Sequence, residues 1–322
     1  MTGNFTPNSS ARRRFTLMLS GEDAFDLDAS QSAPPNGLPQ EQFLLGPHLP
    51  IAPVLLLGQS ELTFSPKQII ACLQPVHLHA TRDHLILLHQ DQIHLSEEES
   101  AKLLQVALPL IEEDFQHTLL HQGKRDWFIP AGRFSSLATH TVEQAHGRNI
   151  DWWMPRDTQE IGVAKLWRKL QNEVQMLWHI NPVNEERDQR GLPAINSLWI
   201  SGIGKLEDLR IPGLFQNISR IYGDSPLLPG LAKHLGIPYQ NQMEISKLDS
   251  AFAWVRNPET LWLELQNALN NECISELELI DFPHGKTRQR IFTGKDLYKK
   301  SWAFWKKSSA ISWQELINLT DL

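Results

Sequence analysis

Cysteine is scarce in this sequence: Cys72 and Cys273 are the only two, and they lie far apart without a Cys-x-x-Cys pair. This spacing excludes a disulfide framework and a cysteine-based zinc site, and it fits a reducing, cytoplasmic location. Long apolar runs are missing as well, since no stretch reaches the roughly 18 residues that a membrane-spanning helix needs. We therefore expect no membrane partner.

Positive charge is also limited. The formal net charge is -7 at pH 7 and the pI is about 6.0, so the chain has no overall attraction for nucleic acid. One local exception is LYKKSWAFWKK, from Leu297 to Lys307, where lysines alternate with aromatic residues. It could form a surface for nucleic acid or an acidic partner, or a terminal helix that docks its aromatics and exposes its lysines. Because no second basic cluster supports the first reading, nucleic acid is not expected as a partner.

The length and composition are those of a folded globular protein. With 322 residues, 41% hydrophobic and 21% charged, the chain can bury a substantial core. The pattern of elements predicts an α/β fold with a mixed sheet or sheets and flanking helices. We expect a strand- and loop-rich region over 1–70, an α+β subdomain over 71–155, and an α/β domain over 156–322 that ends in the basic aromatic helix.

Local patterns predict the elements of the first half. Phe15 to Leu19 reads as a first strand, and the Ser-, Pro- and Gly-rich stretch that begins at Ser30 reads as loop as far as Pro53. Pro53 to Gly58 (PVLLLG) fits a short buried strand, and Pro66 begins a predicted helix with KQIIACL. Ser96 with Glu99 forms a capping box that opens another helix.

The second half gives clearer signals. Thr158 to Trp178 has apolar residues at helical spacing, which predicts a core-packing helix. Ile218 to Tyr222 reads as a strand, followed by a helix that Ser225 caps and Gly236 ends. A helix that starts just behind a strand end is a common ligand position in α/β proteins. Ile274 to Ile280 and Arg288 to Phe292 predict a β-hairpin.

Histidines gather in one region, which raises the possibility of a metal site. Six of the 13 lie between residues 77 and 117, and they are His77, His79, His84, His89, His94 and His117. No carboxylate or cysteine accompanies them at a diagnostic spacing, and no HxxxH or HExxH motif lies on a predicted helix. We expect solvent-facing histidines, no metal and no cofactor.

The stretch NPVNEERDQRGLPAINSLWISGIGK, from Asn181 to Lys205, is the richest in possible ligand groups. Asn184 to Arg190 reads as a charged helical turn and Ile195 to Ser201 as a strand that runs into Gly202-Ile203-Gly204-Lys205. Glycines behind a strand can cradle a phosphate through backbone N–H groups. However, the pattern lacks both the full P-loop and the full dinucleotide motif, so nucleotide binding is not expected.

Several stretches together resemble a known family. They are NPVNEERDQRGLPAINSLWISGIG, the preceding LQNEVQMLWH (Leu170 to His179), GDSPLLPGLAKHLGIP (Gly223 to Pro238), PVHLHATRDHLILL (Pro75 to Leu88) and FWKK (Phe304 to Lys307). The chain resembles the proteobacterial family of RpfE-type regulatory proteins, also described as phosphoglycerate mutase-related. More distantly, the central block is similar to archaeal-type cofactor-independent phosphoglycerate mutases, although Ser201-Gly202-Ile203-Gly204 replaces their glycine-rich WGGG or WGQG run.

The distant resemblance implies chemistry that the residues do not carry. Mutases of that superfamily use two divalent metals, an Asp and a Ser or Thr nucleophile near the first strand, and later Asp/His clusters, because phosphoryl transfer needs metals to stabilise charge. Here the first strand ends in Leu19-Ser20-Gly21-Glu22-Asp23, and no Asp-x-x-Gly-His or Asp-His-Gly pattern follows residue 238. No catalytic residue is therefore assigned.

Two functional hypotheses remain. The first is a non-catalytic ligand-binding or regulatory protein, with an anionic small molecule or a protein as partner; the second is a residual enzyme acting on a small phosphorylated or carboxylated metabolite. For an anionic ligand the candidates are Asn184, Arg187 and Arg190, because arginines give forked hydrogen bonds to phosphate or carboxylate, with Asn196, Gly202 and Gly204 shaping the adjoining wall. The alternative is that Arg187 pairs with an acid or supports the strand. An enzyme should show convergent titratable groups with perturbed pKa values in one pocket beside Arg187.

Overall fold

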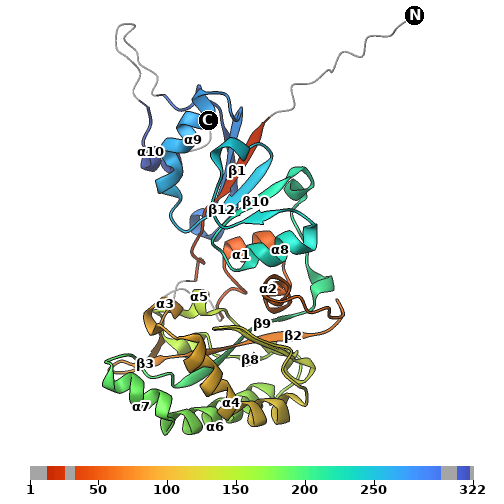
Figure 1. Cartoon of the computed structure of the whole chain (residues 1–322), viewed down its shortest axis with the longest axis vertical. Coiled ribbons are helices and arrows are strands. Elements are labelled where there is room, and N and C mark those ends of the chain that lie inside the picture. Colours follow the sequence, from red (N-terminus) through yellow and green to blue (C-terminus); the bar gives the residue numbers. More distant parts are fainter. Residues whose placement is uncertain (1–12, 26–32, 299–309, 320–322) are drawn as a thin grey trace, which may run out of the picture.

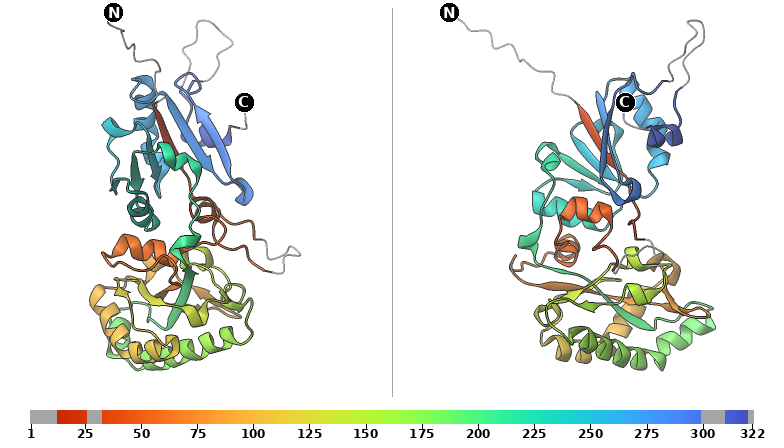
Figure 2. Two further views of the ribbon diagram at one scale, coloured as in Figure 1. Left: turned by 90° about the vertical axis from the view of Figure 1, so that its right-hand side faces the viewer. Right: turned by 180° about the vertical axis from the view of Figure 1, so that it is seen from behind.

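The computed structural model of the chain describes residues 13–25, 33–298 and 310–319. Two lobes are stacked along the long axis of the molecule, each built around its own sheet (Figure 1). Figure 2 shows the same division from the side and from behind. No helix in the described part of the chain is both long and apolar enough to cross a bilayer. The expected α/β class, with mixed sheets and flanking helices, is confirmed.

The upper lobe contains a six-stranded sheet in the order β11-β10-β12-β1-β13-β14. Neighbouring strands are parallel except for β14, which forms an antiparallel pair with β13. The strands are β1 (Arg14–Met18), β10 (Arg220–Gly223), β11 (Tyr239–Gln240), β12 (Ala251–Trp254), β13 (Glu276–Asp281) and β14 (Arg288–Phe292). Because β1 lies between β12 and β13, the start of the chain is held in the middle of this sheet.

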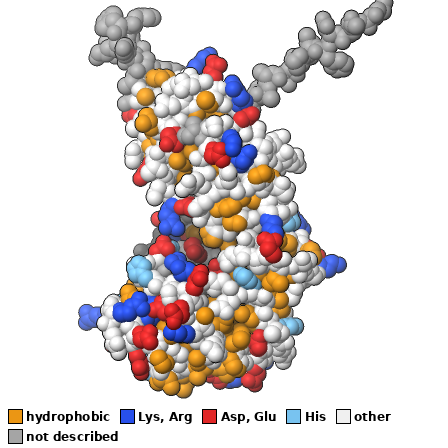
Figure 3. Space-filling model, viewed as in Figure 1, with side chains coloured by type: hydrophobic (Ala, Val, Ile, Leu, Met, Phe, Trp, Pro, Cys, Tyr) orange, Lys and Arg blue, Asp and Glu red, His pale blue; other side chains and the backbone are white. Residues whose placement is uncertain are grey.

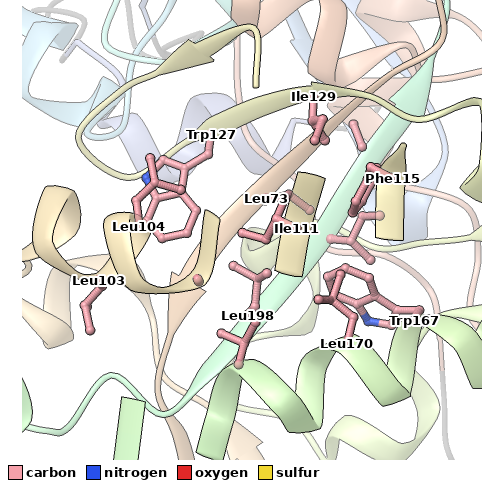
Figure 4. Packing of buried hydrophobic residues seen from close by; sticks show 14 of the residues in the cluster. Leu73, Leu103, Leu104, Ile111, Phe115, Trp127, Ile129, Trp167, Leu170 and Leu198 are labelled. Carbon is pink, nitrogen blue, oxygen red and sulfur yellow. The ribbon is translucent and has the colours of Figure 1, made fainter. Parts of the chain in front are cut away.

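The lower lobe contains an antiparallel sheet in the order β5-β6-β2-β9. Its strands are β2 (Ile70–Val76), β5 (His121–Gln122), β6 (Trp127–Pro130) and β9 (Ser197–Gly204), and two small pairs flank it, β3 (Leu78–Ala80) with β4 (Leu85–Leu87) and β7 (Leu137–Ala138) with β8 (Arg156–Asp157). Helices α4 (Glu97–Phe115) and α6 (Val163–His179) pack on one face, where Trp127, Leu73 and Leu198 meet Leu104 and Trp167 (Figure 4). Helices α3 (Gln90–Ile93), α5 (Val142–Ala145) and α7 (Pro182–Gln189) complete the lobe.

Helix α2 (Ile51–Gln59) joins the lobes. It packs against α8 (Leu227–Leu235) on one side and against the lower sheet on the other, and α1 (Pro39–Leu45) lies beside it (Figure 1). One buried cluster therefore runs from Phe252 of the upper sheet through Val54 to Phe128 of the lower sheet. On the far face of the upper sheet, α9 (Trp262–Asn270) and α10 (Trp313–Asn318) close a separate core.

For two elements the predicted type of secondary structure was wrong, because helix and strand are exchanged. The stretch Pro53 to Gly58, predicted as a strand, belongs to helix α2, and KQIIACL, predicted as a helix, leads into strand β2. In both elements the side chains are buried almost without alternation, so neither a period of two nor a period of 3.6 is visible in the sequence. Part of the predicted loop before Pro53 is also helix α1.

Other predictions are confirmed. Ser96 and Glu99 form the predicted capping box of α4, Gly236 ends α8 in a left-handed conformation, and the predicted hairpin is the pair β13 and β14. The predicted helix from Thr158 to Trp178 is α6, which starts at Val163. Most of the basic aromatic segment from Leu297 to Lys307 lies outside the described residues.

Candidate functional site

A cleft with a volume of about 670 Å³ lies between the lobes and is lined by both of them. We call it the interlobe cleft. Figure 3 shows this side of the molecule hollowed at the junction, with acidic, basic and histidine side chains around the hollow. Its lining residues are Ser20, Leu38, Gln40, Glu41, Ile51, Leu55, Gln74, His89, Asp91, Arg125, Asp126, Thr141, Glu143, His146, Ser201, Asp224, Ser225, Pro226, Leu227, Trp254 and Arg256.

The upper wall is formed by the carboxyl ends of parallel strands. Ser20 follows β1, Asp224 follows β10, and Trp254 ends β12. The Trp254 indole N–H donates to the Ser20 hydroxyl at 2.9 Å, which ties the ends of β1 and β12 together. Ligands of open α/β sheets bind outside the carboxyl ends of the strands, so this wall lies at the expected edge. The predicted strand-to-helix junction at Ser225 is part of it.

The floor is one face of the lower sheet. Cys72 and Ser201 are register partners on β2 and β9, so their side chains share a face, and Gln74 lies two residues further along β2. Asp126 accepts hydrogen bonds from Gln74 (2.8 Å) and Gln59 (2.7 Å). Burial first, and then the charge of Asp126, raise the pKa of the Cys72 thiol well above its ordinary value. Cys72 is therefore a protonated thiol and a poor nucleophile at neutral pH.

Glu41, in the first turn of α1, is the most perturbed carboxyl group of the cleft. Its carboxylate accepts the backbone N–H of Leu38 at 2.8 Å and a hydrogen bond from the Thr141 hydroxyl at 3.4 Å. The side chain is only 5% exposed, and this burial, reinforced by the charge of Glu143, raises the pKa of Glu41 from 4.5 to about 7. Glu41 is thus divided between its protonated and ionised forms near neutral pH.

Glu143, on α5, is the second perturbed carboxyl group. The residue is accessible from the cleft, but the surrounding walls replace much of its bulk water and raise its pKa, and the charges of Asp126 and Asp91 add to the effect. His146 follows α5 and its Nδ1 lies 2.8 Å from the backbone oxygen of Glu143. The pKa of His89, whose ring lies 4.9 Å from that of His146, is lowered by burial.

The arginines at the rim are already paired. Asp91 of the lower lobe lies 3.2 Å from Arg125 and 3.1 Å from Arg256, which comes from the upper lobe. The hydrogen bond from Arg125 is the first cause of the lowered pKa of Asp91. The backbone N–H of Arg256 also donates to Asp224 at 3.0 Å. Each arginine at this rim therefore has a carboxylate beside it, and Asp91 links the two lobes.

Ser201 differs from the other buried polar groups of the cleft. The residue is only 2% exposed, yet its hydroxyl has no hydrogen-bond partner within the described ranges. The oxygen is not among the buried polar atoms sealed from solvent, and the residue lines the cleft. Its hydroxyl therefore faces the cavity with an unused donor and two unused lone pairs.

The structure places the residues predicted for anion binding inside the lower lobe. Arg187 is fully buried, and its guanidinium donates to Glu99 at 2.9 Å and to the backbone oxygens of Pro193 (2.8 Å) and Ile93. The Asn184 side chain bonds both the N–H and the C=O of Ile195 and the C=O of Trp178. These hydrogen bonds hold α7 and β9 in place. They favour the alternative in which Arg187 pairs with an acid or supports the strand.

The other four candidates lie nearby but do not converge on one ligand position. Arg190 is largely exposed and lies 3.3 Å from Glu99, and Asn196 bonds the N–H and C=O of Leu78. Gly202 and Gly204 belong to β9 itself, where an added Cβ would lie 2.8 Å from the backbone of α2 and of Pro50 respectively. These glycines allow the helix to approach the strand, and Gly202 also lines a second cavity. Anion binding by this set stays a prediction.

The histidine-rich region was the predicted place for a metal site, if one were present. Within the described residues, no group of three or more His, Cys, Asp or Glu side chains is arranged to hold a metal ion. His89 lines the interlobe cleft, whereas His77 bonds the backbone oxygen of Ala194 at 2.6 Å.

The residues of the interlobe cleft were not found from the sequence. Pro39 followed by Glu41 is a helix-start signal, as is Thr141 before Glu143. These signals could have predicted α1 and α5. They could not have shown that the two glutamates face one cavity, because the approach of α1 and α5 is set by tertiary packing.

Comparisons with known proteins give weak similarities. No family model matches the chain, and no curated protein matches it. Among solved structures, the PH0037 protein from Pyrococcus horikoshii is similar with a TM-score of 0.39 and 11% identity, over 84% of this chain and 82% of that one. The cofactor-independent phosphoglycerate mutase from Thermoplasma acidophilum gives a TM-score of 0.37 and 13% identity, over 87% and 90%. The chain thus has a weak structural similarity to these two proteins, and the RpfE-type assignment and proteobacterial source stay predictions.

Proposed function

We propose that the protein binds a small polar molecule in the interlobe cleft. The observation that carries this proposal is the Ser201 hydroxyl, which is buried, unpartnered and directed into a cavity that both lobes line. A hydroxyl without a protein partner at the floor of an open cleft is free to form a hydrogen bond with a ligand or with water that enters the cleft. The volume of about 670 Å³ is in the range of small-molecule sites.

This proposal keeps the hypothesis of a ligand-binding protein that was made from the sequence, but it assigns the ligand to the interlobe cleft. Titratable groups converge at Glu41, Glu143 and Asp126, between the lobes, whereas the enzyme alternative predicted such groups beside Arg187. A regulatory protein of mutase ancestry would be one form of this proposal, because closure of two lobes on a ligand can alter the outer surface of a protein.

An enzymatic role is the second candidate, and Glu41 is the observation that favours it. A carboxyl group with a pKa of about 7 can donate or accept a proton at neutral pH. The substrate expected from the mutase resemblance fits less well, because a phosphoglycerate carries about three negative charges at neutral pH. The cleft would place these charges beside Glu143 and Asp126, and both rim arginines are paired with Asp91.

The proposal is tested by thermal unfolding with a panel of small metabolites at millimolar concentration. The panel includes 3-phosphoglycerate with and without Mg²⁺. A ligand that binds only the folded state stabilises it by about 2.7 kcal/mol at a hundredfold excess over its Kd. Ser225→Trp narrows the cleft from its rim, and Ser135→Trp places the same side chain at an exposed position that does not line the cleft.

We expect at least one compound to raise the Tm of the wild type and of Ser135→Trp, but not of Ser225→Trp. A compound that stabilises all three proteins equally binds elsewhere. If that is the only kind of binding found, or if no compound shifts the Tm, the interlobe cleft is not a binding site.

A further inference from the structure

We propose that the ligand of the interlobe cleft carries a protonated amine, which binds between Glu41 and Glu143, and an apolar body that packs toward Trp254. This inference rests on the proposed function and specifies the chemical class of the ligand. It follows from the charges of the cleft, from the unpartnered hydroxyl of Ser201 and from the apolar part of the lining.

Three acidic groups that line the cleft have no lysine or arginine salt-bridge partner among the described residues, and the basic group that acts on Glu143 is the titratable His146. None of the salt bridges among the described residues involves Glu41, Asp126 or Glu143. Asp126 is held by two neutral amides, those of Gln59 and Gln74. The part of the cleft that these three groups line is therefore acidic, and an ammonium group supplies the opposite charge.

The rim does not supply that charge. Arg125 and Arg256 share the carboxylate of Asp91, at 3.2 and 3.1 Å, and Asp224 adds a further acid beside Arg256. An anionic ligand would have to displace Asp91 from both arginines and then enter an acidic cavity. A cationic ligand meets neither obstacle, so electrostatic complementarity favours the amine.

Two further observations point to an organic amine rather than a bare ion. The cavity of about 670 Å³ is far larger than an ion, and the described residues provide no set of three metal-binding side chains. Apolar side chains line the same cavity, and they are Leu38, Ile51, Leu55, Leu227 and Trp254. Ser201, unpartnered at the floor, can accept a hydrogen bond from an ammonium group.

The surroundings of the glutamate pair make binding depend on pH. The titratable groups that surround them are Cys72 on β2, Asp91 in α3, Asp126 before β6 and His146 behind α5. Burial and the charge of Glu143 place the pKa of Glu41 at about 7, so about a tenth of it is ionised at pH 6 and about nine tenths at pH 8. An alkylamine stays protonated over this range. Its affinity should rise about tenfold from pH 6 to pH 8.

The experiment uses titration calorimetry with three compounds that share one aromatic body: phenethylamine, phenethyl alcohol and phenylacetate. Putrescine serves as an aliphatic amine, and Mg²⁺ as a bare cation. Glu41→Gln and Glu143→Gln remove one charge each, and Glu160→Gln is the matched control, because Glu160 is exposed and forms no salt bridge within the described ranges.

We expect at least one amine to bind, to bind at least tenfold more tightly than the alcohol or the acid, and to weaken at least tenfold in each cleft variant but not in Glu160→Gln. Glu41→Gln should also remove the tenfold rise with pH. If phenylacetate or the alcohol binds in the cleft and the amines do not, the amine inference is wrong and the proposed function stands. If only Mg²⁺ binds, the inference is again wrong. If none binds and the metabolite panel also fails, both proposals are overturned.

Discussion

The raised pKa of Glu41 should make the stability of the protein depend on pH in a way that a single substitution removes. Below pH 4.5 the group is protonated in both the folded and the unfolded chain, so it contributes no difference. As the pH rises from 4.5 to about 7, the unfolded chain ionises while the folded protein keeps the proton. The folded state therefore loses stability across this window, and the deficit is constant at higher pH.

The magnitude follows from the two pKa values. The step from 4.5 to about 7, at about 1.36 kcal/mol for each pH unit, gives a deficit of roughly 3 kcal/mol above pH 7. Glu41 is only 5% exposed, so solvent screening reduces this value little. Glutamine does not ionise, and its carbonyl oxygen can still accept the N–H of Leu38. Glu41→Gln should gain about 3 kcal/mol relative to the wild type between pH 4.5 and pH 8.

Urea denaturation followed by tryptophan fluorescence at several pH values measures this difference, with Glu160→Gln as the exposed control. Taking the difference between two proteins cancels the titration of all groups that they share. The two stability curves should separate between pH 4.5 and 7 and then run parallel. Curves that stay parallel throughout, or that separate only above pH 8, would refute the assignment of the raised pKa to Glu41.

Two further substitutions test the packing that holds the cleft walls. Arg187→Ala removes the buried cation paired with Glu99, which keeps only the Ser96 N–H and Arg190 as donors, and removes the side-chain donor of two backbone oxygens. It should lower the free energy of unfolding by about 3 to 5 kcal/mol. Arg190→Ala removes an exposed pair and should change it by less than about 1 kcal/mol; equal effects would contradict a structural role for Arg187. Gly230→Ala would place a Cβ 1.8 Å from a backbone oxygen of α2 and should destabilise by about 3 kcal/mol, whereas Gly132→Ala meets no atom within 4 Å and should be nearly neutral. Urea denaturation measures all four, and a stable Gly230→Ala variant would show that α2 and α8 do not pack closely.

Elements with one buried face could be predicted from the sequence, and elements buried on all sides could not. Helix α6 has a strong apolar stripe, and the hairpin β13–β14 is bounded by turn residues, so both were recognised. Helix α2 is buried between α8 and the lower sheet, and β2 lies in the middle of that sheet. Their apolar runs contain no periodicity, and Pro75 in β2 argues against a strand. The proline is tolerated because pairing with β6 stops at Leu73.

The interlobe cleft could not be predicted from the sequence for a related reason. Residues 181–205 are dense in amides, arginines and glycines, which in a sequence resembles a ligand loop. In the structure these groups satisfy each other, as Arg187 with Glu99 and Asn184 with Ile195 show. The residues of the interlobe cleft come instead from separate parts of the chain, and their approach depends on α2 packing between the lobes.

The carboxyl group of Glu41 is not required by the fold, and this is the strongest reason to assign it a function. Its structural contacts are the N–H of Leu38 and the hydroxyl of Thr141. A glutamine could accept the first through its carbonyl oxygen and donate to the second through its amide, without a charge to bury. The ionisable group instead lowers the stability of the folded state by roughly 3 kcal/mol at neutral pH, and Glu143 beside it makes ionisation harder. Groups that break a rule of stable folding without a local gain are most often found at functional sites. What glutamate offers at this position and glutamine does not is a negative charge or a transferable proton, and either would act on the ligand that we propose for the cleft.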